Sequence, residues 1–285
     1  MFRLFSLWKT FTSAVFYLTL AVSLGGLVGN GLVLWHLGLR IKKGPFSIYL
    51  LHLATADFLF LACHVVFSVV QAALDSQDTL YFVLTFLGFA AGLWLLAAFS
   101  AERCLSDLFP GCYQGCRPRH TSAVLCALGW ALTLLVILVP ADTCGLLRRG
   151  KRLLACLRYH MASVAWLLAL ACVACTAGLV LFIWVACCLG HQRPHFYGIV
   201  LGATLLFFFC GLPFVIYWSL RTLLDILPVL PLLATLLACI NSSWKPLFYF
   251  IAGRKPGKRE PLQAVLQRAL GEEAMQGLSL PLGRV

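Results

Sequence analysis

Residues 46–74 read FSIYLLHLATADFLFLACHVVFSVVQAAL and contain one acidic residue, Asp57, and no Lys or Arg. About 20 apolar residues suffice for a helix to cross the hydrocarbon core of a bilayer, so this stretch predicts a membrane-spanning helix. Similar stretches recur along the whole chain. We predict spans near 14–38, 46–74, 80–103, 121–140, 161–189, 195–220 and 226–250.

The composition excludes a soluble domain. Hydrophobic residues make up 61% of the chain and charged residues 11%, whereas soluble domains average about 25% charged residues. In lipid every backbone polar group needs an internal partner, which leaves helices or a closed barrel. A barrel would show short segments of alternating polarity, but the apolar runs here are long and continuous. The sequence therefore predicts an all-α membrane protein, a bundle of seven transmembrane helices.

Charge and cysteine content exclude two other classes. The net charge is +12, but the basic residues form short clusters between apolar runs and no continuous patch, so we expect no nucleic-acid partner. The 13 cysteines lack the paired spacing of metal ligands. Neither an enzyme's catalytic constellation nor a cofactor site is recognisable.

The distribution of Lys and Arg outside the spans predicts the orientation. With the N-terminus extracellular, twelve of these residues fall on the inner side and eight on the outer side. Residues 251–285 are then a cytoplasmic tail. Within it, apolar residues recur at helical spacing over 261–270, which predicts an amphipathic helix lying on the inner membrane surface. A soluble tail helix is the alternative.

Polar groups within spans are costly and mark function by default. Asp57 and Lys245 lie in the second and seventh spans, and Glu102–Arg103 ends the third. The only two asparagines of the chain, Asn30 and Asn241, also lie within spans. We predict a mid-membrane polar site formed by Asn30, Asp57, Asn241 and Lys245.

Six short motifs follow one another in the order of the rhodopsin-like receptors. They are Gly29-Asn30, L-A-x-x-D ending at Asp57, Glu102-Arg103-Cys104, Trp130, F-C-G-L-P ending at Pro213, and P-L-F-Y from Pro246 to Tyr249. The longer runs GPFSIYLLHLA, AERCLS and NSSWKPLFY resemble the Mas-related G-protein-coupled receptors, and the resemblance runs end to end.

This resemblance implies a plasma-membrane receptor that passes the signal of an unknown extracellular ligand to a heterotrimeric G protein. It also implies expression in sensory neurons and a role in nociception or itch. Gly211 stands where most such receptors have Trp, and the motif of the seventh span is altered. A non-signalling partner that modulates related receptors therefore stays open as an alternative.

The resemblance also assigns roles to single residues. It implies that Arg103 contacts the G protein, that Glu102 restrains Arg103 in the inactive state, and that Pro213 is a hinge. Pro246 and Tyr249 complete the activation switch. An Arg103 that merely reaches the membrane surface is the alternative. A further restraint is an acid at the start of the sixth helix, where this chain has Arg193. Phe207, Phe208 and Phe209 are expected to replace the packing of the absent Trp, or simply to form an aromatic core.

Two further expectations concern the outer side. The resemblance implies a disulfide between Cys144 and Cys156, with free thiols as the alternative. Relatives that bind cationic ligands carry acids at the outer ends of the fourth and fifth helices, where this chain has Pro140 and Met161. The outer loop is basic, so we expect a ligand that is not polycationic. Its basic residues are Arg148, Arg149, Lys151, Arg152 and Arg158.

Lys245 replaces an Asn that is common before the Pro of the seventh helix. In related receptors the Asp of the second helix binds sodium with help from this Asn and from a Ser in the third helix, where this chain has Gly92. A buried Lys needs an anionic partner. We therefore predict an Asp57–Lys245 ion pair in place of sodium. The alternatives are a Lys245 that points elsewhere, or a neutral Lys245 beside a protonated Asp57.

Overall fold

The computed structural model of the chain describes residues 2–39, 45–74, 79–118, 120–147, 152–189, 195–221, 229–254 and 264–265. Over these residues the α-helices are α1 Phe2–Leu39, α2 Pro45–Leu74, α3 Thr79–Leu108, α4 Pro110–Cys116, α5 Thr121–Thr143, α6 Leu153–Trp184, α7 His195–Leu206, α8 Leu212–Arg221 and α9 Val229–Gly253. Two π-helical segments, η1 Val185–Leu189 and η2 Phe207–Gly211, extend α6 and join α7 to α8.

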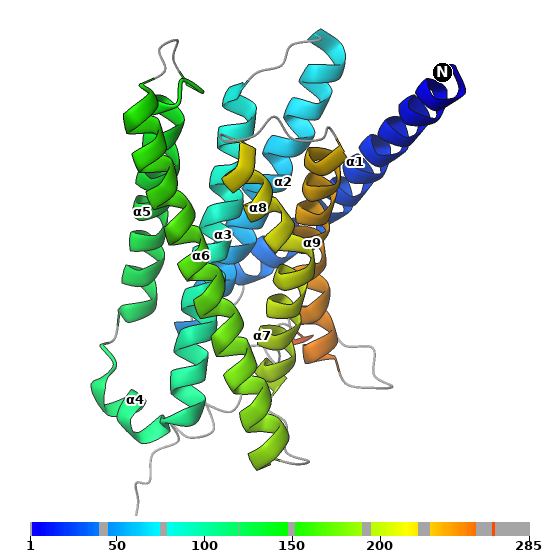
Figure 1. Cartoon of the computed structure of the whole chain (residues 1–285). Helices are drawn as coiled ribbons and strands as arrows, with labels where there is room; N and C mark the ends of the chain where they lie inside the picture. The colour runs from blue at the N-terminus through cyan, green and yellow to red at the C-terminus, as the bar shows by residue number, and fades with distance from the viewer. Residues whose placement is uncertain are drawn as a thin grey trace, which may run out of the picture.

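The long helices form a seven-helix bundle (Figure 1). Helix α3 packs against α2, α5 and α6, and α1 packs between α2 and α9, while the N-terminal end of α1 projects away from the bundle. By length and hydropathy six described helices qualify as membrane spans: α1, α2, α3, α5, α6, and α7 with α8. The seventh, α9, has 25 residues and carries Asn241 and Lys245.

Several helices extend beyond the predicted spans. Helix α1 begins at Phe2 instead of near residue 14, and α6 begins at Leu153 instead of near residue 161. Hydropathy locates only the part that crosses hydrocarbon, whereas a helix continues wherever its backbone hydrogen bonds remain satisfied. The seven-residue helix α4 is too short for a periodic pattern and was not predicted. Of the predicted tail helix 261–270, the structure describes only Ala264 and Val265, both helical.

Pro213 explains the π-helical segment before it. Proline lacks a backbone N–H, and its ring collides with the carbonyl four residues earlier, here that of Phe209. The backbone widens over Phe207–Gly211 to relieve this collision, and the helix resumes its α form at Leu212. The predicted position of a hinge therefore coincides with a local change of helix type.

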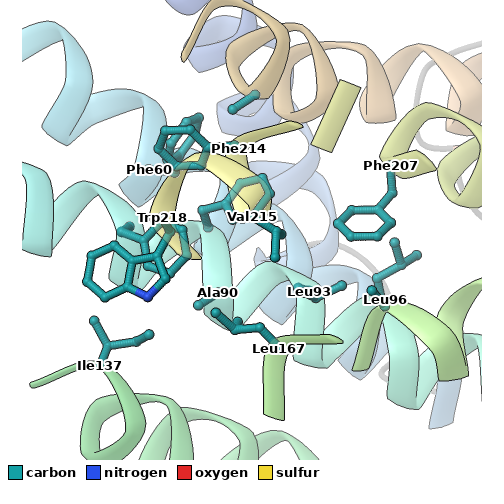
Figure 2. Close-up of a cluster of buried hydrophobic side chains, with 14 of the residues drawn as sticks. Phe60, Ala90, Leu93, Leu96, Ile137, Leu167, Phe207, Phe214, Val215 and Trp218 are labelled. Atoms are coloured by element: carbon teal, nitrogen blue, oxygen red, sulfur yellow. The ribbon is translucent and has the colours of Figure 1, made fainter. Parts of the chain in front are cut away.

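Aromatic side chains fill the core of the bundle on the α8 side (Figure 2). Phe60 from α2, Phe86 and Phe89 from α3, and Phe214 and Trp218 from α8 all belong to one buried cluster. Phe207 and Trp218 lie at opposite ends of the part drawn in Figure 2. Elsewhere the outward faces of the helices expose large apolar side chains, as expected for surfaces that meet lipid.

Candidate functional site

The two opposite charges predicted for the membrane interior form a direct ion pair. Lys245 Nζ lies 2.8 Å from Asp57 Oδ1 and 3.0 Å from Asp57 Oδ2, so the ammonium donates to both carboxylate oxygens. Each side chain is only 3% exposed. Helices α2 and α9 are thus joined at a point that water does not reach.

Asn30 links helix α1 to the same region. Its side chain is fully buried, and its Nδ2 donates to the carbonyl oxygens of Gly26, at 3.0 Å, and Ser242, at 3.1 Å. Gly29, one residue earlier, lies against Pro246, and a Cβ added to it would be 3.5 Å from the proline ring. Asn241 is also buried, and its Oδ1 has no hydrogen-bond partner within the described ranges. The structure therefore gathers the predicted polar residues around the α1–α9 contact.

Gly92 brings helix α3 to this site. A Cβ added at Gly92 would lie 3.7 Å from Asp57 Oδ1. The position named as the lost sodium ligand therefore faces the carboxylate directly. Because glycine has no side chain, it contributes no oxygen there.

Glu102, at the far end of α3, is held by Tyr113 and Arg117, which no sequence motif links to it. Its Oε1 accepts hydrogen bonds from the hydroxyl of Tyr113 in α4 and from Nε of Arg117. Arg117 also donates from Nη2 to Ser122 Oγ at the start of α5. This cluster of four residues, which we call the α4 clamp, fixes the α3–α5 connection onto α3. Pro110 at the first position of α4 is the one sequence signal for this helix.

The surroundings of the α4 clamp keep the Tyr113 hydroxyl and the Arg117 guanidinium protonated. Burial raises the pKa of the Tyr113 hydroxyl, and the hydrogen bond and charge of Glu102 raise it further. Burial lowers the pKa of the Arg117 guanidinium, but the hydrogen bond and charge of Glu102 outweigh burial and leave this pKa raised. Both donors therefore keep their protons at neutral pH.

Arg103 contacts one residue of its own helix and one of α2. Its Nη1 lies 3.8 Å from Asp107 Oδ1, and its guanidinium carbon lies 3.8 Å above the ring of Phe46 in α2. Side chains four residues apart share a helix face, whereas neighbours such as Glu102 and Arg103 point in different directions. In the structure Arg103 pairs with Asp107 and Glu102 pairs with Arg117, and a restraint of Arg103 by Glu102 stays a prediction. Arg193, the other residue of the expected restraint, lies outside the described residues.

The three consecutive phenylalanines before Pro213 do not all pack into the core. Phe207 is buried, but Phe208 and Phe209 are 49% and 67% exposed, so the expectation that all three take over core packing is wrong. Consecutive residues on a helix cannot all face one side. A Cβ added at Gly211 would lie within 3.0 Å of the Phe207 ring, so Phe207 occupies the space that a larger residue 211 would need.

Tyr249 and the Cys144–Cys156 disulfide complete the predicted site residues. Tyr249 is buried in one apolar cluster with residues of α2 and α3, and its hydroxyl has no hydrogen-bond partner within the described part of the chain. Cys144 and Cys156 form a disulfide with their Cα atoms 4.6 Å apart. The chain turns between them through Gly145, whose φ of 75° suits glycine, and Arg152 N donates to Thr143 O at 3.1 Å. The disulfide thus ties α5 to α6.

Comparison with known proteins identifies the family. No protein-family model matches the chain. It is 71% identical over 287 residues to human "Mas-related G-protein coupled receptor member G", covering 99% of both chains. It is 54% identical to the rat receptor of that name, over all of both chains. Human member E is 42% identical, over 94% of this chain and 88% of that one. The chain therefore belongs to the Mas-related G-protein-coupled receptors, and it is a multi-pass membrane receptor that signals through G proteins.

Proposed function

We propose that this chain lies in the plasma membrane of sensory neurons with its N-terminus outside the cell. There it transmits the signal of an extracellular ligand to heterotrimeric G proteins and so contributes to nociception or itch. The full-length identity to Mas-related receptors carries this proposal. The excess of Lys and Arg in the segments on the side of α4 supports the orientation.

Within this proposal, Arg103 and the α4 clamp form the surface that meets the G protein. Both lie at the end of α3, which faces the cytoplasm in the proposed orientation. Pro213 and the π-helical segment provide the place where α7 swings outward to open a cleft beside Arg103. Asp107 and Phe46 hold Arg103 until that happens.

The Asp57–Lys245 ion pair takes the place of a bound sodium ion in this proposal. The ammonium of Lys245 is already hydrogen-bonded to the carboxylate of Asp57, and Gly92 has no side-chain oxygen that could bind a sodium ion. A second cation beside Lys245 would be repelled. Signalling is then expected to be insensitive to sodium.

Ligand-independent coupling tests the proposal before any ligand is known. Mini-G proteins of each class are recruited to the full-length receptor in intact cells, and recruitment is compared between the unaltered chain, Arg103→Ala, and the control Arg158→Ala. We expect measurable recruitment that Arg103→Ala reduces at least tenfold and that Arg158→Ala leaves unchanged. No recruitment above that of Arg103→Ala, together with altered signalling of a co-expressed Mas-related receptor, would favour a modulatory partner instead.

A further inference from the structure

A cavity of about 590 Å³ lies between α3, α4, α5 and α6, and Glu102, Tyr113 and Arg117 of the α4 clamp form part of its wall. Its size lies within the range of about 300–1,000 Å³ typical of small-molecule sites. Most of its lining is apolar, with Ala97, Ala98, Leu125, Leu170 and Val173 among the residues that form it.

Two thiols also line this cavity. Cys112 and Cys116 are both exposed, and they lie four residues apart on α4, so they share one face of that helix. Leu105 and Phe109, which line the same cavity, are 54% and 60% exposed, and exposed apolar side chains of this size suit a position at the membrane surface. The other free cysteines that the structure describes do not line the cavity, and residues 254–285 contain no cysteine.

The charged residues that line the cavity, Glu102 and Arg117, neutralise each other. The carboxylate of Glu102 is paired with Arg117 and accepts from Tyr113, so no isolated charge opposes an apolar occupant. An occupant therefore needs a long apolar body, and the two thiols offer a point of covalent attachment at the rim.

From this arrangement we propose that Cys112 or Cys116 is S-acylated and that the acyl chain lies in the cavity between α3, α5 and α6. The inference rests on the proposed orientation, which places α4 in the cytoplasm. The donor is a long-chain acyl-coenzyme A. The cysteine sulfur attacks the thioester carbonyl carbon, the bond from that carbon to the coenzyme A sulfur breaks, and the departing thiolate takes up the thiol proton. No electron donor or acceptor is required.

The proposed modification has a structural consequence. An acyl chain attached to α4 and seated between α3, α5 and α6 would fill space beneath the helix that carries Tyr113. It would thereby hold α4 against α3, in the arrangement that places Tyr113 and Arg117 on Glu102. Acylation is then a reversible control of the surface proposed to meet the G protein, because a thioester is hydrolysed by thioesterases.

The first test is chemical. Cells expressing the full-length receptor are fed an alkynyl fatty acid, and hydroxylamine-sensitive label is measured on the purified chain. The double variant Cys112→Ser/Cys116→Ser should lose at least fivefold of this label, and the control Cys187→Ser, an exposed thiol outside the cavity, should retain most of it. Equal labelling of the double variant and the unaltered chain would overturn the proposal.

The second test asks where the chain lies. The receptor is purified into lipid nanodiscs, and its melting temperature is measured before and after hydroxylamine. We expect a fall of several degrees for the unaltered chain and for Ala127→Phe on the exposed face of α5, but none for Ala98→Phe, which fills the cavity. An unchanged melting temperature in the unaltered chain would show that the acyl group lies in bulk lipid, and would overturn the placement.

A third measurement separates this inference from the proposed orientation. A membrane-impermeant maleimide is applied to intact cells after removal of thioesters, and labelling is compared between the unaltered chain and the double variant. Equal, low labelling agrees with a cytoplasmic α4. Labelling that depends on Cys112 and Cys116 would overturn the orientation itself, whatever the outcome of the acylation assay.

Discussion

The indole ring of Trp218 lies flat on the ring of Phe86, with centroids 4.0 Å apart and planes 7° apart. Phe82 stacks on the same indole at 5.2 Å, and Phe214 contacts Phe86 at 5.5 Å. The stack joins α8 to α3 above the π-helical segment that precedes Pro213. Any outward movement of the other half of this helix therefore pivots against a packed aromatic core.

Replacing Trp218 by Ala should destabilise the receptor by about 3–5 kcal/mol, because the change removes a buried aromatic side chain and leaves a cavity. Trp218→Phe should cost much less, since a ring can still stack on Phe86. Trp244, which is 50% exposed on α9, provides the matched control, and Trp244→Ala should change little. Thermal unfolding in nanodiscs measures all three. Equal losses for Trp218→Ala and Trp244→Ala would contradict a special role of the stack.

Arg117→Ala should destabilise the receptor, because it removes one of the two donors, Tyr113 and Arg117, whose hydrogen bonds hold the buried carboxylate of Glu102. Hydrogen bonds to charged groups are worth about 1.5–3 kcal/mol, and the loss should approach this value. Glu102→Gln should cost less, and adding it to Arg117→Ala should recover part of the loss. The melting temperatures of the three variants form the measurement. If Glu102 were instead bound to Arg103, Arg117→Ala would be neutral.

Cys144→Ser should cost about 3 kcal/mol, since it opens a covalently closed loop with a sequence separation of 12. Because both cysteines serve one bond, Cys156→Ser and the double variant should show the same loss as Cys144→Ser alone. Surface expression and thermal unfolding are the readouts. Losses that add in the double variant would show that each cysteine stabilises the receptor independently of the disulfide.

A polycationic peptide should fail to activate this receptor. Arg152 is exposed beside the disulfide and Arg158 is exposed in the first turns of α6, although Asp142 is exposed at the end of α5. Positive charges at the end of the bundle that carries the disulfide lower the local concentration of a cation there. Recruitment of mini-G proteins is measured with a polycationic peptide and with a neutral peptide of equal length. Potent activation by the cationic peptide, absent from cells that do not express the receptor, would sink this idea.

Hydropathy predicted most of the fold because each span depends only on a local run of apolar residues. The contact between Asp57 and Lys245 was predictable for a related reason, since two opposite charges in lipid have few alternatives to each other. The α4 clamp was not, because α4 has no periodicity and Tyr113 and Arg117 look like ordinary loop residues. Nor was the stack of Trp218 on Phe86, because apolar residues far apart in sequence give no sign of their partner. Phe208 and Phe209 point outward because consecutive residues on a helix face different directions, and the F-C-G-L-P motif does not show which residue faces the core.

The Asp57–Lys245 pair permits the most direct test of a single contact. Removing one partner leaves a buried charge, so Lys245→Ala and Asp57→Ala should each cost about 3–5 kcal/mol, and the double variant should cost less than the sum. Surface expression and melting temperature in nanodiscs measure this cycle, and strictly additive losses would mean that the pair contributes no interaction energy.

Exchange of sodium for choline at constant ionic strength should leave coupling of the unaltered chain unchanged, because the ammonium of Lys245 is already paired with the carboxylate of Asp57. A Gly92→Ser/Lys245→Asn variant supplies two oxygen ligands beside the freed carboxylate, and the Ser Cβ fits 3.7 Å from Asp57 Oδ1. Its basal coupling should therefore fall in sodium and recover in choline. A sodium response in the unaltered chain, or none in this variant, would defeat the idea that the lysine has replaced the ion.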